Sequence, residues 1–181
     1  MSDLNERMIA QVQSKPPRCL EGFRATTAPQ EEWPEHVDWA LGCQCGAERG
    51  SILGYSLRDV MPDYHGTEVF VSPMAFLCSA CGATTELIDT AKHGYNSEIS
   101  TMEESSDATV RRTGERKKFA CPGCQGETFS VKTTFGHSHF DLIEDEPDLE
   151  PRAQDFFDSF NCRGQCEKCG QWADFASFEL A

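Results

Sequence analysis

The sequence predicts a small, β-rich α+β protein in which two cysteine-rich units follow an N-terminal helix. Three observations lead to this prediction. The chain has 181 residues, which is enough for one domain or two small ones. Eight of its 10 cysteines fall into four close pairs along the chain. Segments rich in β-branched and aromatic residues flank these pairs, as expected for strands joined by tight turns.

Two helices are expected outside the cysteine pairs. The first covers residues 3–14, where Met8 and Val12 lie about one turn apart and prolines at positions 16 and 17 end the pattern. The second is expected over Pro151–Phe160, with the proline in its first turn and three phenylalanines on its apolar side.

The strands and the change in composition divide the chain into four segments. Serine, glutamate and threonine, followed by a basic cluster, dominate residues 96–118, which is typical of a linker. We therefore expect an N-terminal helical segment with a lead-in at 1–28, a first unit at 29–95 and a second unit with an acidic insert at 119–181. The predicted strands beside the cysteine pairs are 70–77, 84–88, 128–135 and 172–178.

The cysteine pairs have the spacing of metal-binding turns. One pair has the spacing C-x-C and three have C-x2-C, and they are Cys43/Cys45, Cys78/Cys81, Cys121/Cys124 and Cys166/Cys169. Zinc takes four ligands in a tetrahedron at about 2.3 Å per sulfur, so two thiolates on one tight turn fill two corners. Such turns often end in a residue with positive φ, which favours glycine. Gly46, Gly82 and Gly170 stand directly after their pairs, whereas Gln125 and then Gly126 follow the third pair.

A hairpin with C-x2-C-G at its tip resembles a zinc knuckle, and two knuckles that face one metal resemble a zinc ribbon. The sequence therefore resembles the zinc-ribbon group over the four pairs and their flanking strands. The resemblance implies two tandem ribbons, each holding one structural zinc ion in a closed four-cysteine site. The implied ligands are Cys43, Cys45, Cys78, Cys81, Cys121, Cys124, Cys166 and Cys169.

Two ways of combining the pairs are open. Sequential pairing places the first two pairs on one zinc ion and the last two on the other. Cross-braced pairing, as in RING-like modules, combines the first pair with the third and the second with the fourth. Each half of the chain starts with a pair, continues into a strand, carries a long insert and closes with a C-x2-C-G pair, which favours sequential pairing and indicates a loose internal duplication. Cys19 and Cys162 are left over. Cys19 is expected to be a non-ligand. For Cys162, a small buried side chain is favoured, and the alternative is that it replaces one of the ligands four residues later in the chain.

The charge of the chain limits its partners. It has 16 basic and 30 acidic residues, which gives a net charge of −14. Such a chain repels DNA, RNA and anionic lipid, and we expect a basic protein partner instead. A solvated loop is the alternative interpretation of its main acidic run. The acidic residues expected to contact the partner are Asp141, Glu144, Asp145, Glu146, Asp148 and Glu150.

The leading functional interpretation is a non-catalytic protein–protein interaction module. A zinc ion with four cysteine ligands has no open position for water, so the cysteines argue for a structural metal rather than for catalysis. No phosphate-binding glycine loop or calcium-binding loop occurs, and no small-molecule substrate is evident. The size and charge are typical of stoichiometric inhibitors such as immunity proteins and antitoxins. The alternatives are a zinc-ribbon factor associated with nucleic acid or transcription, and a redox or metal-handling protein.

The expected location is the cytoplasm. Residues 1–15 contain no apolar stretch typical of a signal peptide. No window approaches the roughly 20 apolar residues that a membrane-spanning helix needs. In a reducing cytosol disulfides rarely persist, which further favours metal binding by the paired cysteines.

Overall fold

The computed structural model describes residues 3–29, 33–95, 115–138, 140, 143 and 147–180. The helical elements are α1 (Asp3–Ser14), α2 (Leu57–Val60) and the 3₁₀ segments η1 (Arg18–Leu20) and η2 (Pro147–Asp155). The strands are β1 (Phe23–Pro29), β2 (His36–Cys43), β3 (Arg49–Ser56), β4 (Phe70–Cys78), β5 (Thr84–Ile88), β6 (Lys117–Lys118), β7 (Phe129–Gly136), β8 (Ser159–Cys166) and β9 (Trp172–Glu179).

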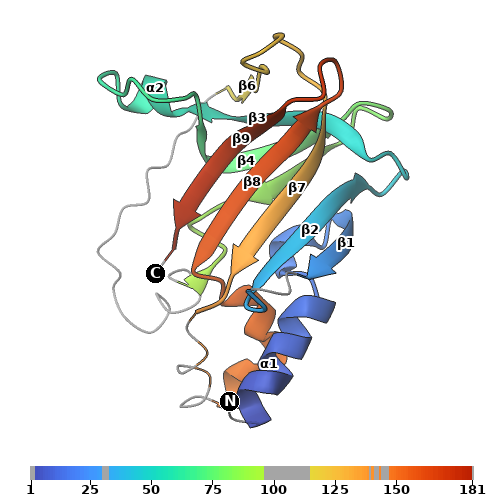
Figure 1. Ribbon diagram of the computed structural model, residues 1–181, viewed down its shortest axis with the longest axis vertical. Helices are drawn as coiled ribbons and strands as arrows, with labels where there is room; N and C mark the ends of the chain where they lie inside the picture. The colour runs from blue at the N-terminus through green and yellow to red at the C-terminus, as the bar shows by residue number, and fades with distance from the viewer. Residues whose placement is uncertain are drawn as a thin grey trace.

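The nine strands form one antiparallel sheet that curls into a half-barrel (Figure 1). Along the main path the order is β1-β2-β7-β3-β4-β5, with β6 beside β3. Strand β8 pairs with the other edge of β7, and β9 follows β8. The predictions of a β-rich α+β protein and of an N-terminal helix are confirmed.

The same order of elements occurs twice along the chain. Each half has a cysteine turn, a strand, an insert, a second strand, a second cysteine turn and a third strand. The strands pair as β3-β4-β5 in the first half and as β7-β8-β9 in the second. The two halves therefore have the same topology, as the duplicated sequence pattern indicates.

The two halves meet at equivalent residues. Gly50 lies five residues after Cys45, and Phe129 lies five residues after Cys124. These two residues pair with each other across β3 and β7. Pairing of equivalent residues in antiparallel strands is what an approximate twofold axis through the pair produces.

Backbone hydrogen bonds beside the cysteine turns follow the same approximate symmetry. In the first half, the N–H of Ser79 donates to the carbonyl of Arg49 at 3.1 Å. In the second half, the N–H of Glu167 donates to the carbonyl of Thr128 at 2.9 Å. Each bond fixes the second cysteine turn of its half against the start of that half's first strand.

Strand β7 carries partners from both predicted units. Its residues from Lys132 to Gly136 pair with β2, while Phe129 and Ser130 pair with β3. The predicted first unit (29–95) and second unit (119–181) therefore share one sheet. Residues 117 and 118, at the end of the predicted linker, form β6 beside β3, and residues 96–114 lie outside the described residues.

The hydrophobic core is rich in phenylalanine. The rings of Phe119 and Phe129 both lie edge-on to Phe175, with centroids at 4.8 and 4.9 Å. All three side chains are buried. Gly50, at the centre of the sheet, leaves room for Phe76, because a Cβ there would lie 2.4 Å from that ring.

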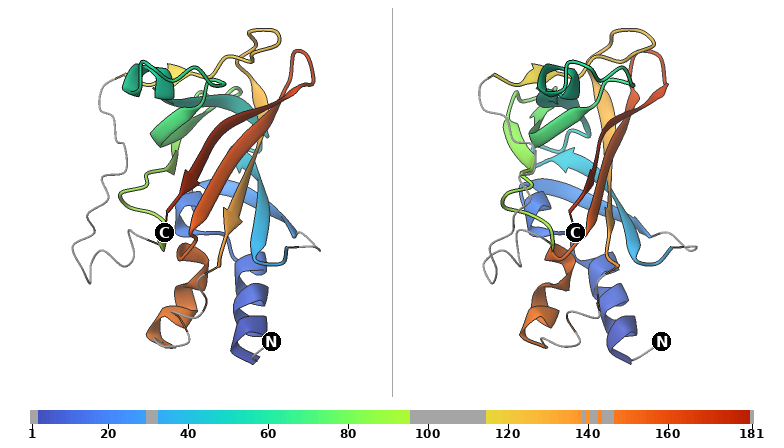
Figure 2. Two further views of the ribbon diagram at one scale, coloured as in Figure 1. Left: turned by 60° about the vertical axis from the view of Figure 1, so that its left-hand side comes forward. Right: turned by 90° about the vertical axis from the view of Figure 1, so that its left-hand side faces the viewer.

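Helix α1 and segment η2 lie side by side at one end of the sheet (Figure 2). Gln11 joins them, since its side-chain amide donates to the carbonyl of Glu150 at 2.9 Å and to the side chain of Gln154 at 2.8 Å. The predicted apolar face of α1 is confirmed, because Met8 and Val12 are buried.

The prediction of one helix over Pro151–Phe160 is wrong. Segment η2 ends at Asp155 and has a kink at Arg152, and β8 then begins at Ser159. The phenylalanines of this region are buried as predicted, but the last one is a strand residue. An apolar run of this length does not by itself distinguish a buried helix from a strand, and pairing with β7 and β9 decides for the strand.

The core arrangement leads to a stability prediction. We expect Phe175→Ala to lower the free energy of unfolding by about 3–5 kcal/mol, because it leaves a cavity between two buried rings. Trp172→Ala, on the same strand but 56% exposed, serves as the control with a cost of about 1 kcal/mol or less. Urea unfolding followed by circular dichroism measures both variants, and equal costs would contradict this account of the core.

Candidate metal centres

Three cysteine turns have the same backbone hydrogen bonds. The N–H of the first cysteine donates to the carbonyl five residues later, at 2.9 Å for Cys78 and 2.8 Å for Cys121 and Cys166. Its own carbonyl accepts from the N–H four residues later, at 3.1 Å for Cys78 and 2.8 Å for the other two. These bonds close a tight turn that directs both cysteine side chains to one side.

The C-x-C turn is a version shortened by one residue. The N–H of Cys43 donates to the carbonyl of Ala47 at 2.7 Å, and the N–H of Gly46 donates back to the carbonyl of Cys43 at 2.9 Å. Both bonds span one residue fewer than their counterparts in the C-x2-C turns. The C-x-C turn therefore keeps both backbone hydrogen bonds although it is one residue shorter.

The predicted left-handed residue is present after all four pairs. Gly46, Gly82 and Gly170 have φ values of 96°, 71° and 74°. In the third turn Gln125 itself adopts a φ of 60°. Gly126 is required there for another reason, because a Cβ would lie 3.1 Å from one cluster sulfur and 3.3 Å from another.

The turns bring the cysteines together in two groups of four. Cys43, Cys45, Cys78 and Cys81 form the first group, and Cys121, Cys124, Cys166 and Cys169 form the second, with all sulfurs of a group within 4.8 Å of one another. The grouping is sequential rather than cross-braced. The turns within a group meet because the strands that carry them are paired, Gly50 with Cys78 in the first half and Phe129 with Cys166 in the second.

The sulfur separations suit tetrahedral metal binding. In each group the first cysteine of one turn faces the second cysteine of the other. The Sγ–Sγ distance is 3.7 Å for Cys43–Cys81, and it is 3.6 Å for Cys45–Cys78, Cys121–Cys169 and Cys124–Cys166. The edge of a tetrahedron around a metal bound to sulfur at about 2.3 Å is about 3.8 Å. A disulfide requires about 2.05 Å. The two groups are therefore suited to structural metal binding.

Within each turn, the first cysteine is buried and the second is more exposed. Cys43 and Cys78 are buried, whereas Cys45 and Cys81 are exposed. The second group repeats this pattern, with Cys169 exposed. Each site therefore lies at the surface, anchored on its inner side to the strands that carry the turns.

Backbone N–H groups favour the thiolate form of one cysteine in each group. The N–H of Cys81 is the main donor that lowers the pKa of Cys78 to about 6. Burial raises the pKa of Cys166, but N–H donors, with that of Cys169 the strongest, outweigh it and lower the pKa to about 7. Since the thiolate is the metal ligand, these two cysteines are prepared for binding near neutral pH.

A second cysteine in each group retains its proton. The N–H of Cys45 lowers the pKa of Cys43, but burial and the three neighbouring cysteines outweigh it and raise the pKa to about 12. Cys169 has a pKa of about 12 for a similar reason: the N–H of Gln171 lowers the pKa, but the neighbouring thiols, with that of Cys124 the strongest, outweigh this effect. A metal ion must displace these protons, so its apparent affinity increases with pH.

Cys19 and Cys162 belong to neither group. Both are buried, and burial is the main cause that raises the pKa of each thiol. Cys162 lies on β8 and points into the core in line with Phe160. Cys162 is thus a small buried side chain, as the favoured interpretation predicted, and Cys19 lies outside both groups.

Most of the predicted acidic contact surface lies outside the described residues. This applies to Asp141, Glu144, Asp145 and Glu146. Asp148 is exposed at the start of η2, and Glu150 forms an ion pair with Arg7 of α1 at 3.2 Å. In the described part of the chain, one member of the run is therefore open to a partner and one helps to hold the two helical elements together.

Comparison of the chain with protein-family models, with curated proteins and with solved structures gives no match in any of the three. Within the described residues, no helix has the length and apolar character needed to cross a membrane. The fold and the cysteine groups define the class: a β-rich α+β protein with two sites suited to structural metal binding.

Two glycines of the second site are required for different reasons, one for space and one for its left-handed backbone, and this difference leads to a prediction. We expect Gly126→Ala to lower the metal affinity of this site by tenfold or more, because the new methyl group presses on the sulfurs of Cys124 and Cys166. Gly170→Ala meets no atom within 4 Å, so it should cost stability by about 1–2 kcal/mol through its left-handed backbone. Competition titration with a chromophoric chelator measures affinity, and an equal loss in both variants would argue against the steric explanation.

Proposed function

We propose that each four-cysteine group holds one structural zinc ion. Soft thiolate ligands in a tetrahedron are the preferred environment of zinc among the common divalent metals. The sulfur separations of 3.6–3.7 Å support this assignment. Four protein ligands complete the coordination shell, so the ions would stabilise the fold and leave no position for an activated water molecule.

The position of the sites supports a structural role. Each group ties the start of one strand to the end of its neighbour, β3 to β4 in the first half and β7 to β8 in the second. A chain of this size, split into two small halves, gains much of its stability from such cross-links. This arrangement is also consistent with the proposed likeness to zinc ribbons.

We expect Cys81→Ser and Cys169→Ser each to reduce the zinc content from two ions to one and to lower stability by several kcal/mol, as loss of a structural metal does. Metal analysis of the purified protein and urea unfolding measure the two effects. Cys162→Ala is the control, because it also removes a cysteine but should retain both ions. Near-native stability of the two serine variants would rule out structural zinc.

We infer that the protein is a non-catalytic binding module for a basic protein, of the stoichiometric inhibitor type. The net charge of −14 is the observation that carries this proposal. Closed zinc sites would make the charge more negative, since four thiolates outweigh one divalent ion. A strongly acidic surface accelerates association with a cationic partner and selects against nucleic acid.

The described part of the basic cluster, Arg116 to Lys118, forms ion pairs with carboxylates elsewhere in the protein, which supports this proposal over a nucleic-acid-binding function. Lys117 lies 2.6 Å from Asp59, and Lys118 lies 3.4 Å from Glu127. Arg116 lies 3.6 Å from Glu86. Because these three cations already face carboxylates, a phosphate would have to compete with an internal partner at each of them.

The test is a comparison of two charge-neutralised variants in the native host. The first replaces the six acidic residues of the 141–150 run by their amides, and the second does the same at six exposed carboxylates elsewhere: Glu6, Glu21, Asp63, Glu115, Asp174 and Glu179. We expect the wild type to co-purify with one basic protein at near-equal amounts. Only the first variant should lose this partner, because the 141–150 run is the proposed contact surface. The second variant is the matched control, since both variants have the same net charge.

The complex should also weaken as salt is raised, since screening reduces attraction between exposed charges. Loss of the partner from both variants alike would show that net charge, and not this run, is responsible. Capture of nucleic acid or of transcription proteins would favour the zinc-ribbon factor instead. A solitary protein would contradict the inhibitor proposal.

A further inference from the structure

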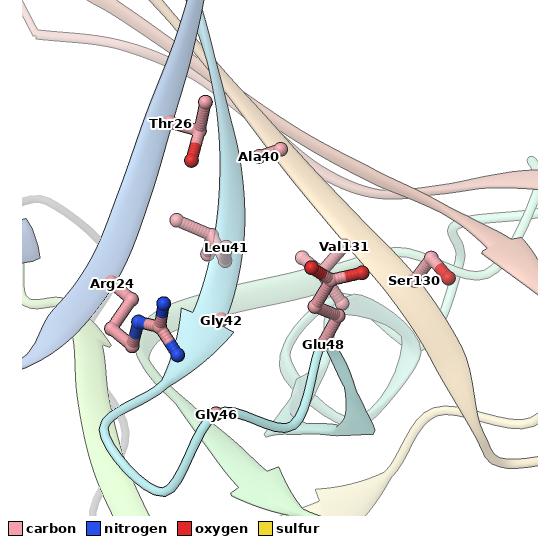
Figure 3. Close-up of a pocket in the computed structure, with 9 residues that line it drawn as sticks. All are labelled: Arg24, Thr26, Ala40, Leu41, Gly42, Gly46, Glu48, Ser130 and Val131. Carbon is pink, nitrogen blue, oxygen red and sulfur yellow. The ribbon is translucent and has the colours of Figure 1, made fainter.

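A cavity of about 330 Å³ opens in the outer face of the sheet where β2 separates from β7 (Figure 3). Strand β2 pairs with β7 as far as Ala40, and β3 takes over the same edge of β7 at Ser130. Val131 lies between the two pairings and lines the opening. The cavity is therefore a product of the fork in the sheet, and its size falls at the lower end of the range of small-ligand sites.

Two opposite charges line this cavity. The guanidinium group of Arg24 extends from β1, and the carboxylate of Glu48 rises from the segment before β3, on the other side of β2 (Figure 3). The hydroxyl groups of Thr26 and Ser130 complete the polar lining. In the described part of the chain, none of these four side chains has an ion pair or hydrogen bond with another residue.

The lack of internal partners distinguishes this cavity from the larger one beside α2. That cavity, of about 640 Å³, also has charged residues in its lining. There, however, Lys117 pairs with Asp59 at 2.6 Å and Arg58 pairs with Glu68 at 3.4 Å. At the fork, by contrast, an incoming molecule can engage both charges without breaking an ion pair. A third cavity, of about 410 Å³, also has opposite charges in its lining, but there Arg163 lies over the ring of Trp172, 5.4 Å from its centroid, and directly opposite Asp174 on the paired strand.

Glycine keeps the space between the two charges open. Gly42 lies on β2 between Arg24 and Glu48, where a side chain would occupy the cavity (Figure 3). A Cβ at this position would lie 3.3 Å from the carbonyl oxygen of Arg24, so a larger residue would crowd the backbone of β1. Gly46 of the first cysteine turn lines the lower end, and a Cβ there would lie 3.2 Å from the guanidinium of Arg24.

The pair of charges selects the class of ligand. A simple anion would be drawn to Arg24 but repelled by Glu48 and by the net charge of −14. A simple cation would meet the reverse conflict at Arg24. We propose that the cavity binds a small zwitterion with a carboxylate and an ammonium group, the chemistry of a free amino acid. Its carboxylate lies against Arg24 and its ammonium group against Glu48, both as charge-assisted hydrogen bonds.

The proposal does not depend on the protein partner or on the acidic run, so it is tested on the purified, zinc-loaded protein. The probes are glycine, β-alanine, γ-aminobutyrate and L-leucine. The first three increase the separation of the two charges by one carbon at a time, and the last adds an apolar side chain. Propionate and propylammonium, which carry one charge each, are the control ligands.

Amide chemical-shift titration locates and measures binding. We expect at least one zwitterion to shift the amides of Gly42 and Gly46 at millimolar concentration and to bind tenfold more tightly than either singly charged compound. Arg24→Gln and Glu48→Gln should each weaken binding about tenfold or more, as loss of one charge-assisted contact does. Arg163→Gln, in the lining of a different cavity, and Glu179→Gln remove the same kinds of charge and should leave the shifts at Gly42 and Gly46 unchanged.

Three results would overturn the proposal. The first is the absence of shifts at these glycines with all four zwitterions. The second is an affinity for propionate or propylammonium equal to that for the zwitterions, which would show that one of the two charges is sufficient for binding. The third is equal weakening by the control variants, which would indicate a general effect of net charge.

Discussion

The antiparallel pairing of Gly50 with Phe129 is the contact on which the rest of the structure depends. It joins two halves of equal topology through equivalent residues, and so it turns two small three-stranded units into one sheet. The ion pair between Arg49 and Glu167 crosses the same junction, from the strand after the first cysteine turn to the last cysteine turn. Both four-cysteine groups are thereby tied to one continuous sheet, and the loss of either is expected to affect the shared core.

Residues related by the approximate twofold axis have taken opposite roles. Two aromatic rings cannot occupy the same place in a close-packed core. The pair at the axis therefore combines a large residue, Phe129, with a glycine, Gly50. Phe129 fills the centre together with Phe119 and Phe175. Gly50 makes room for Phe76, which lies edge-on to Phe23 from the N-terminal hairpin. This asymmetry gives the two halves one core although their strands follow the same plan.

The proposed activities occupy different parts of the molecule. Segment η2, with the exposed Asp148, lies beside α1 at the end of the sheet opposite to the turn between β8 and β9 (Figures 1 and 2). The cavity with Arg24 and Glu48 lies on the outer face near the first cysteine turn. The two cysteine groups, the proposed surface for a basic protein and the proposed zwitterion site can therefore be altered separately.

The local features of this protein follow from short stretches of its sequence. Turn chemistry sets the cysteine geometry, the left-handed glycines and the strands beside them, and helical periodicity places α1, because all of these depend on residues close together in the chain. Sequence order also favoured the grouping of the cysteines. Other features become visible in the folded chain alone: β2 and β3 share one edge of β7, residues 159–166 form a strand, and Arg24 and Glu48 line one cavity. These features arise from pairing between distant segments, and that pairing depends on how the whole core packs rather than on any local pattern.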